Sequence, residues 1–244
     1  MADTPLVNLT IEGRPVAVAP GTTILEAAKS AGVLIPHYCY HPGLPVAGVC
    51  RMCLVEVEKF PKLAPSCATA VAEGQVVHVH SEKAREARKG VLEMLLINHP
   101  LDCPICDQSG ECELQDYTYQ EGRKDSRYRE PKRFNPVDDF GGDVLYVQNR
   151  CILCTRCVRF MDDVARDTVL NVSERGDRAF IGKFEGRTSR TRGRPMSSTC
   201  VRLAHSSRRT SSTRRVRGSS TARRRCAPDA RRGATSSLRR ATTR

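Results

Sequence analysis

The sequence predicts an α+β fold for the first part of this 244-residue chain. Residues 6–18 alternate apolar and polar side chains on both sides of a turn at residues 12–14, which indicates a β-hairpin. A helix is expected at residues 24–31, and alternating segments at 53–60 and 75–80 indicate returning strands. A hairpin, a helix and returning strands in such a short stretch are typical of a small α+β domain.

The predicted helices have recognisable ends. Thr23 and Glu26 have the spacing of a capping box, and Gly32 is a typical helix stop. A second, amphipathic helix should begin at Ser81 and end before Pro100. We expect its charged side to carry Glu82, Lys83, Arg85, Glu86 and Arg88, and its apolar side Val91, Leu92, Leu95 and Leu96.

The formal charge of +13 is unevenly distributed. The segment 187–244 holds 18 of the 40 Lys and Arg residues and one of the 27 acidic residues, so residues 1–186 carry a net charge of −4. The body is therefore expected to be a mildly acidic protein. The segment 187–244, rich in Arg, Ser and Thr, has no helix or strand period, and we predict that it is disordered.

Twelve cysteines raise the choice between disulfides and metal sites. Residues 1–10 lack the basic start and long apolar run of a signal peptide, and no apolar stretch approaches the roughly 20 residues that span a bilayer. We therefore expect a reduced setting, in which cysteine pairs at C-x-x-C spacing bind metal rather than form disulfides.

The first group of cysteines has the spacing C-x10-C-x2-C followed by a fourth after 13 residues. Four thiolates can hold a [2Fe–2S] cluster, and this spacing is a stretched form of the plant-type ferredoxin pattern, a β-grasp-like fold. A structural zinc ion or ordinary buried cysteines are the alternatives. The candidate ligands are Cys39, Cys50, Cys53 and Cys67.

The second group has the spacing H-x3-C-x2-C-x5-C, directly after the amphipathic helix. Three thiolates and one imidazole can ligate a [4Fe–4S] cluster or a structural zinc ion, and the chemistry alone leaves both open. The candidate ligands are His99, Cys103, Cys106 and Cys112.

The third group, Cys151, Cys154 and Cys157, has the C-x2-C-x2-C spacing of [4Fe–4S] ferredoxins. A fourth cysteine commonly follows after three residues, but that position is Met161. The fourth ligand must therefore come from elsewhere, and the remaining cysteines are Cys200 and Cys226. Three arginines lie next to ligands of the first and third groups: Arg51, Arg156 and Arg159. We expect them either to raise the cluster potentials or to lie at a subunit interface.

No catalytic group is predicted, because the chain has no Gly-rich dinucleotide loop and neither a Ser-His-Asp set nor a carboxylate pair stands out. The three ligand groups in this order resemble the family of the bacterial NADH-quinone oxidoreductase G subunit, which is the 75-kDa subunit family of mitochondrial complex I. The resemblance covers about residues 5–186 and rests on the segments 37–42, 48–57, 98–116 and 150–160. In this family the His-Cys₃ motif binds a [4Fe–4S] cluster, which decides against zinc there.

The resemblance implies four parts: a [2Fe–2S] domain at 1–82, a mainly helical His-Cys₃ domain at 83–122, an incomplete ferredoxin-like [4Fe–4S] domain at 140–186, and the tail at 187–244. It also implies an electron relay in respiratory complex I. Electrons would come from NADH through a flavin on a partner subunit and leave toward quinone, on the cytoplasmic side of the inner membrane. NAD-linked hydrogenases and formate dehydrogenases have related modules, but they usually carry Cys where this chain has Met161.

In the family, the fourth ligand of the third cluster lies in a downstream Leu-Cys-Pro-x-Gly-Ala stretch. Shifting the reading frame across residues 199–205 can recover Leu-Cys-Pro-Leu-Gly-Ala, so we interpret the tail as a frameshift product that begins after about Gly186. Cys200 then stands at the ligand's place with altered neighbours, and it is kept as a candidate ligand. A natural basic tail that docks on anionic lipid or nucleic acid is the rival interpretation.

Overall fold

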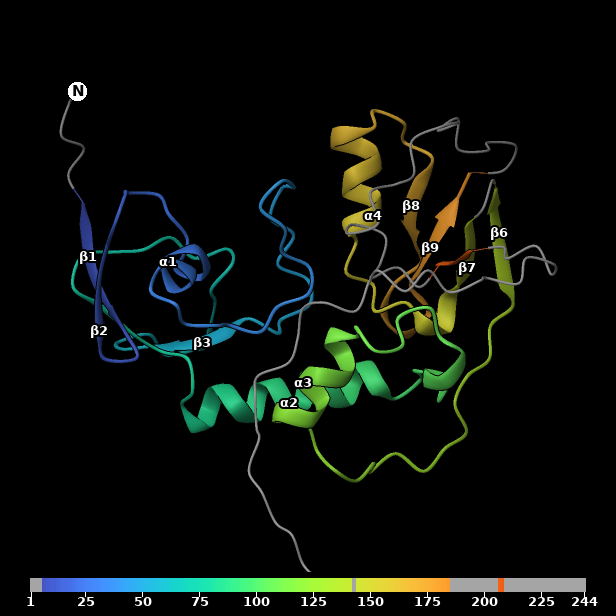
Figure 1. Cartoon of the computed structure of the whole chain (residues 1–244), viewed down its shortest axis with the longest axis horizontal. Coiled ribbons are helices and arrows are strands. Elements are labelled where there is room, and N and C mark those ends of the chain that lie inside the picture. Colours follow the sequence, from blue (N-terminus) through green and yellow to red (C-terminus); the bar gives the residue numbers. More distant parts are fainter. Residues whose placement is uncertain (1–5, 142–143, 185–205, 209–244) are drawn as a thin grey trace, which may run out of the picture. The chain divides into compact units, whose positions relative to one another are not determined.

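The computed structural model describes residues 6–141, 144–184 and 206–208 (Figure 1). The part of the chain up to Arg209 forms one unit by its internal contacts. Most of the predicted tail, including Cys200 and Cys226, lies outside the described residues.

The N-terminal part forms a mixed five-stranded sheet in the order β2-β1-β5-β3-β4. The strands β1 and β2 are antiparallel, β1 and β5 are parallel, and β3 is antiparallel to both β5 and β4. The hairpin and the two returning strands that the alternation predicts are present, and the structure adds a third, two-residue strand, β4, that it does not predict. The strands span Val7–Ile11 (β1), Arg14–Val18 (β2), Leu54–Val57 (β3), Ala64–Pro65 (β4) and Gln75–His78 (β5).

The β1–β2 hairpin turns at Glu12 and Gly13, whose φ angles are 49° and 76°. Two consecutive positive φ values are the signature of a type I′ turn, whose twist matches that of the flanking strands. The Glu12 carboxylate accepts hydrogen bonds from the backbone N–H groups of Val79 and His80, the latter at 2.8 Å. The turn residue thus also fixes the chain where it leaves β5.

Helix α1 (Ile24–Ser30) lies beside this hairpin in Figure 1 and begins as predicted. The Thr23 hydroxyl accepts from the Glu26 N–H at 3.4 Å, and Gly32 follows the helix with a φ of 69°. In a capping box the Glu26 carboxylate would accept from the Thr23 backbone N–H, but here it accepts from the Tyr40 hydroxyl at 2.7 Å. Glu26 therefore anchors the loop that carries Cys39. The core between sheet and helix contains Leu9, Ile11, Ile24, Leu25, Val55, Val57, Val77 and Val79.

Helix α2 (Glu82–Leu96) begins after Ser81, whose hydroxyl accepts from the Ala84 N–H at 3.3 Å, and packs on α3 (Glu113–Glu121) (Figure 1). The prediction that Arg88 lies on the charged, solvent-facing side of α2 is wrong, because its side chain is completely buried. Residues 122–136, which follow α3, contain no helix or strand.

The buried Arg88 guanidinium donates to the Val79 carbonyl at 2.9 Å, to the Leu54 carbonyl at 3.4 Å and to the Glu121 carboxylate. Carbonyl and carboxylate oxygens from three separate segments thus replace water around this charge. A charged residue is buried only where such partners exist, and the helical pattern of α2 does not reveal partners that lie elsewhere in the chain.

The third part combines short helices with two small sheets. Strands β8 (Leu170–Ser173) and β9 (Phe180–Lys183) pair antiparallel, and β6 (Val137–Gly141) pairs with β7 (Val144–Val147). The chain between these sheets holds a short helix, α4 (Arg156–Arg159), which continues as a π-helical turn at Phe160–Val164. Three 3₁₀ turns complete the described elements: η1 (Cys103–Ile105), η2 (Gln148–Arg150) and η4 (Gly176–Arg178).

Within the predicted disordered tail, Ser206–Arg208 forms a strand, β10, antiparallel to β7. The expectation of a tail without strands is therefore wrong at these three residues. Strand pairing is made by backbone groups, so an edge strand can accept a partner whose sequence has no strand period.

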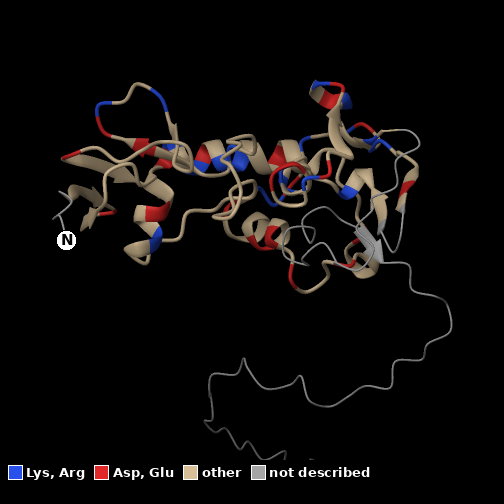
Figure 2. Cartoon of the chain, turned by 90° about the horizontal axis from the view of Figure 1, so that it is seen from above, with Lys and Arg blue, Asp and Glu red and all other residues tan. Residues whose placement is uncertain are grey.

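Acidic and basic residues alternate along the described ribbons rather than forming a region of one sign (Figure 2). This agrees with the small net charge of residues 1–186. None of the helices in the described part of the chain is long and apolar enough to cross a membrane.

Candidate metal centres

The four cysteines of the first group converge beside α1. Hydrogen bonds between side chains link the Cys39 thiol to Cys50 and Cys67, and link the Cys67 thiol to Cys53. Cys39, Cys53 and Cys67 are buried, with exposures of 1%, 1% and 0%. The loop that carries Cys39 also directs its backbone N–H to the Cys50 sulfur at 3.5 Å. Four converging thiols with a backbone donor directed at sulfur fit the ligand set of a [2Fe–2S] cluster.

Contacts among these thiols favour negative charge at particular sulfurs. Hydrogen bonds from the Cys50 and Cys67 thiols lower the pKa of Cys39, and a hydrogen bond from the Cys67 thiol lowers the pKa of Cys53 to about 7. The thiolate is the form that ligates iron. The same hydrogen bonds to Cys39 raise the pKa of Cys50 and of Cys67, so metal binding at this site requires these two thiols to give up their protons.

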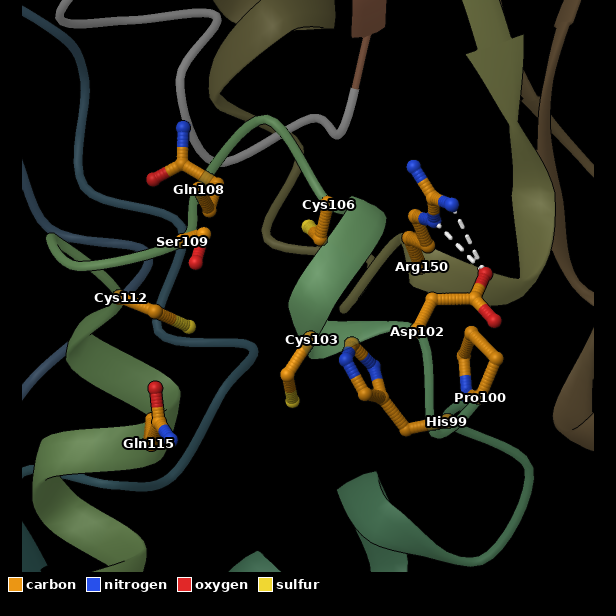
Figure 3. Close-up of a pocket in the computed structure, with 10 residues that line it drawn as sticks. All are labelled: His99, Pro100, Asp102, Cys103, Cys106, Gln108, Ser109, Cys112, Gln115 and Arg150. Atoms are coloured by element: carbon orange, nitrogen blue, oxygen red, sulfur yellow. Dashed lines mark hydrogen bonds and ion pairs between the residues drawn. The ribbon is translucent and has the colours of Figure 1, made fainter.

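All four predicted ligands of the second group line one pocket, as Figure 3 shows. Cys103 lies on the 3₁₀ turn η1, Cys106 directly follows that turn, and Cys112 precedes the first residue of α3. His99 reaches the pocket from the segment that follows α2. The remaining lining residues are Pro100, Asp102, Gln108, Ser109, Gln115 and Arg150.

The His99 imidazole is held in its neutral form. Burial lowers its pKa to about 4, and the nearby positive charges of Lys132 and Arg150 contribute to this lowering. Only the neutral ring offers a nitrogen lone pair to a metal. At neutral pH the site therefore presents an imidazole that is ready to coordinate.

A titration of the metal-free chain should find His99 protonating near pH 4 rather than near its ordinary value of 6.5. Since the folded-state pKa is depressed, the neutral ring contributes stability above pH 6.5 that is lost as the pH falls through 4. NMR detection of the His99 imidazole shifts as a function of pH measures this directly. Protonation of His99 near its ordinary pKa would contradict the burial of the ring.

The third group lies around α4. Cys154 and Cys157 are 4% and 5% exposed, and the Leu153 N–H donates to the Cys151 sulfur at 3.4 Å. Burial raises the pKa of Cys151 to about 11 and of Cys157 to about 12. Two buried thiols and the half-buried thiol of Cys151, all close to one short helix in sequence, fit three ligands of a [4Fe–4S] cluster.

Met161 packs into the core of this third part. Its side chain is 1% exposed and contacts a buried cluster that contains Tyr146, Cys157, Leu170 and Ile181. The position that commonly supplies a fourth thiolate therefore provides apolar packing here. Cys200, the predicted fourth ligand, lies outside the described residues, and its role stays a prediction.

The second and third groups are joined by an ion pair between residues adjacent to their ligands. The Arg150 guanidinium donates to one oxygen of the Asp102 carboxylate at 2.8 and 3.0 Å (Figure 3). Asp102 immediately precedes Cys103, and Arg150 immediately precedes Cys151. The pair therefore ties the chain at one predicted ligand to the chain at another.

One apolar core contains a cysteine from each of the three groups. Cys39 and Cys154 are buried in it, and Cys112 packs against it. Its other buried members come from the segments around the cysteines of the first and third groups, from α2 and from α3: Tyr38, Met52, Leu92, Leu114, Tyr117 and Ile152. One cysteine of each candidate centre thus lies in or against the same packed core, whereas Cys103 of the second centre is exposed.

The sequence motifs identify the ligand groups but not all the residues that support them. Three supporting features leave no pattern in the local sequence, because each joins segments that are distant in the chain. They are the ion pair of Arg150 with Asp102, the hydrogen bond from Tyr40 to Glu26 and the burial of Arg88. Among the described residues, no group of three or more His, Cys, Asp or Glu side chains is arranged to hold a single metal ion. The individual ligand assignments remain predictions.

Three family descriptions match consecutive parts of the chain. Residues 4–82 match a "2Fe-2S iron-sulfur cluster binding domain", residues 88–127 match the "NADH-ubiquinone oxidoreductase-G iron-sulfur binding region", and residues 141–194 match the ferredoxin-like domain of "NADH-quinone oxidoreductase subunit 3". These matches confirm the prediction of a 2Fe–2S domain followed by 4Fe–4S regions.

Individual proteins show the same relationship. The chain is 50% identical over 180 residues to the mitochondrial NADH-ubiquinone oxidoreductase 78 kDa subunit of Candida albicans, and 45% identical over 179 residues to the NADH-quinone oxidoreductase G subunit of Rickettsia bellii. Each match covers 73% of this chain but 25% and 26% of the relative, so the chain spans about a quarter of these proteins' length.

A solved structure is also similar. A chain of the NAD⁺-reducing [NiFe]-hydrogenase in its H₂-reduced state superposes with a TM-score of 0.72 at 30% sequence identity. The similarity covers 84% of this chain and 88% of that one. The arrangement of strands and helices described above is therefore shared with a chain of an enzyme that reduces NAD⁺.

Proposed function

We propose that this chain, which belongs over residues 4–194 to the G-subunit family of NADH-quinone oxidoreductases, relays electrons one at a time through iron–sulfur clusters that its cysteines hold. The observation that carries this proposal is the apolar core shared by Cys39, Cys112 and Cys154, one from each ligand group. A relay requires redox centres to be close to one another in a fixed, dry interior, and this core provides that setting.

The chain's own residues hold and tune the centres rather than make or break bonds. When bound, the clusters supply one-electron oxidation and reduction. The thiolates of the first group set the charge of the first site, and the His99 imidazole and the three thiolates that line its pocket set the charge of the second. Burial of Cys39, Cys53 and Cys67 limits the access of water to the first site. Because these influences act on potential, we assign no acid, base or nucleophile to the chain.

We place the relay in a respiratory complex. Electrons enter from NADH through a flavin on a partner subunit and leave toward quinone through other subunits of the peripheral arm. The complex then lies on the cytoplasmic side of the inner membrane, and this chain reaches the membrane only through its partners. Two features support this placement: identities of 45% and 50% to named subunits of such complexes, and the packed Met161 in the third site.

The second candidate function is the iron–sulfur subunit of an NAD-linked hydrogenase or formate dehydrogenase. The superposition on a chain of the NAD⁺-reducing hydrogenase favours it. The partners that co-purify with the tagged chain distinguish the two functions: components of a quinone-reducing complex support the first, and the large subunit of a hydrogenase or formate dehydrogenase supports the second.

The relay itself is tested by stopped-flow reduction of the full chain, purified anaerobically. With NADH and the flavin subunit of the same organism, the cluster absorbance should bleach and reduced-cluster EPR signals should appear. With NADH alone, no bleaching is expected, because the chain has no predicted nucleotide site. Rapid reduction by NADH without the flavin subunit, or none with it, would refute the proposal.

Replacing His99 with cysteine should lower the midpoint potential of the second cluster, since a neutral ligand is exchanged for a thiolate and the site becomes more negative. EPR-monitored redox titration measures the shift. Leu101→Cys is the matched control, because it adds a thiol two residues away on a side chain that is 86% exposed. An unchanged potential together with an unchanged [4Fe–4S] signal in His99→Cys would remove His99 from the ligand set.

A further inference from the structure

Two arginines of α4 donate hydrogen bonds to the loop that begins with the first ligand. The Arg159 guanidinium donates to the Cys39 carbonyl at 2.6 Å, to the Cys154 carbonyl at 3.2 Å and to the Pro45 carbonyl. The Arg156 guanidinium donates to the Tyr40 carbonyl at 2.6 Å. A single side chain, Arg159, thus bridges a predicted ligand of the first site and one of the third.

These guanidiniums have no acidic partner in the part of the chain that the structure describes. Arg156 is 7% exposed, and the Nε–H groups of Arg156 and Arg159 are buried without a hydrogen-bond acceptor. The ion pairs among the described residues include neither side chain, in contrast to Arg150, which pairs with Asp102. A buried charge without a counter-charge is costly, so this arrangement needs a source of negative charge nearby.

The thiolates are the negative groups within reach. Arg159 donates to the backbone carbonyls of both Cys39 and Cys154, so its charge lies beside a predicted ligand of each site. Cys39 and Cys154 are also buried in the same apolar core, which brings the first and third groups together. Ligated iron–sulfur clusters are anionic at these positions and can supply the missing counter-charge.

We infer that Arg159, assisted by Arg156, is a positioning residue that fixes the loop of residues 39–45 on the third site and balances the negative charge of the clusters held there. This inference rests on the proposed function for the identity of the clusters. The bridge from Cys39 to Cys154 keeps the two sites at a constant separation. The positive charges of the buried Arg156 and the half-buried Arg159 favour the reduced, more negative state of the first cluster and so raise its potential.

The test compares three variants of the full chain. Arg159→Gln removes the charge and most of the donors, whereas Arg159→Lys keeps the charge but cannot bridge the Cys39, Pro45 and Cys154 carbonyls together. Arg175→Gln is the control, because Arg175 is an exposed arginine of the same part with no described side-chain contact. Two quantities are measured: the midpoint potential of the [2Fe–2S] signal by EPR, and the hydrogen–deuterium exchange of a peptide that covers residues 38–47.

Arg159→Gln should make the midpoint potential of the [2Fe–2S] cluster more negative. At a fixed solution potential, the ratio of reduced to oxidised cluster should then fall about three- to tenfold. It should also accelerate exchange in the 38–47 peptide at least threefold. Arg159→Lys should recover the potential in part but not the slow exchange, and Arg175→Gln should resemble the wild type. A potential and an exchange rate that both stay at wild-type values in Arg159→Gln would overturn the inference, and so would full recovery of both by lysine.

The exchange measurement is repeated on the cluster-free chain, so that failure of the inference is separable from failure of the proposed function. If the wild-type chain binds no iron, the proposed function is refuted, and faster exchange in Arg159→Gln still supports the positioning role. Equal exchange in all variants of the cluster-free chain, with iron bound normally by the wild type, refutes the positioning role alone.

Discussion

Replacing Cys67 with alanine should abolish the [2Fe–2S] EPR signal of the reduced chain and leave its [4Fe–4S] signals in place. Cys67 is completely buried, and its thiol hydrogen-bonds to both Cys39 and Cys53, so no other described cysteine can take its position. Removing it leaves three thiolates for a cluster that requires four ligands. Iron content and EPR of the anaerobically purified variant measure the loss.

The control for this experiment is Ser66→Ala, the neighbouring residue in the same loop. Ser66 is also completely buried, and its hydroxyl donates to the Cys53 carbonyl at 2.9 Å. We expect that variant to lose about 1 kcal/mol of stability, one neutral hydrogen bond, while keeping the cluster. A [2Fe–2S] signal that survives Cys67→Ala, or that disappears equally in Ser66→Ala, would show that the ligand assignment is wrong.

Replacing Arg88 with alanine should lower the free energy of unfolding by about 3–5 kcal/mol, the usual cost of breaking a buried ion pair from one side. The guanidinium is fully buried and donates to two carbonyls and to the Glu121 carboxylate, whose side chain is 14% exposed. All three acceptors lose their partner in the variant. Urea denaturation followed by circular dichroism measures the change.

Arg85→Ala is the matched control, since Arg85 lies on the same helix but is exposed, and its effect should stay within about 0.5 kcal/mol. Arg88→Met separates packing from charge: it refills most of the volume but leaves the Glu121 carboxylate unpaired, so we expect it to be destabilised nearly as much as alanine. A loss below about 1 kcal/mol in Arg88→Ala would mean that the buried pair contributes little to stability.

Local patterns predicted the local structure well. The alternation around Glu12 and Gly13, the Thr23 cap and the Ser81 start each depend on residues close together in sequence, and the structure has the corresponding hairpin and helices. The cysteine spacings predicted three ligand groups for the same reason. A ligand group that closes within a loop imposes its own short-range pattern, which a single sequence displays.

The long-range features were not predictable in the same way. Helical periodicity placed Arg88 with the charged residues of α2, yet its acceptors lie in β3, directly after β5 and in α3. The pattern of one helix does not reveal them. Arg156 and Arg159 were identified as arginines next to ligands, but their partners Tyr40 and Cys39 lie 116 and 120 residues away. Which arginine is buried depends on the tertiary structure, and Arg51, also next to a ligand, is exposed.

The central claim is that this chain holds iron–sulfur clusters at its first two cysteine groups. Anaerobic purification of the full chain, followed by iron, acid-labile sulfide and zinc analysis and by EPR of the dithionite-reduced protein, tests it most directly. We predict iron and sulfide in equal amounts, with a [2Fe–2S] signal and at least one [4Fe–4S] signal. A colourless product that contains zinc and no sulfide would contradict the account.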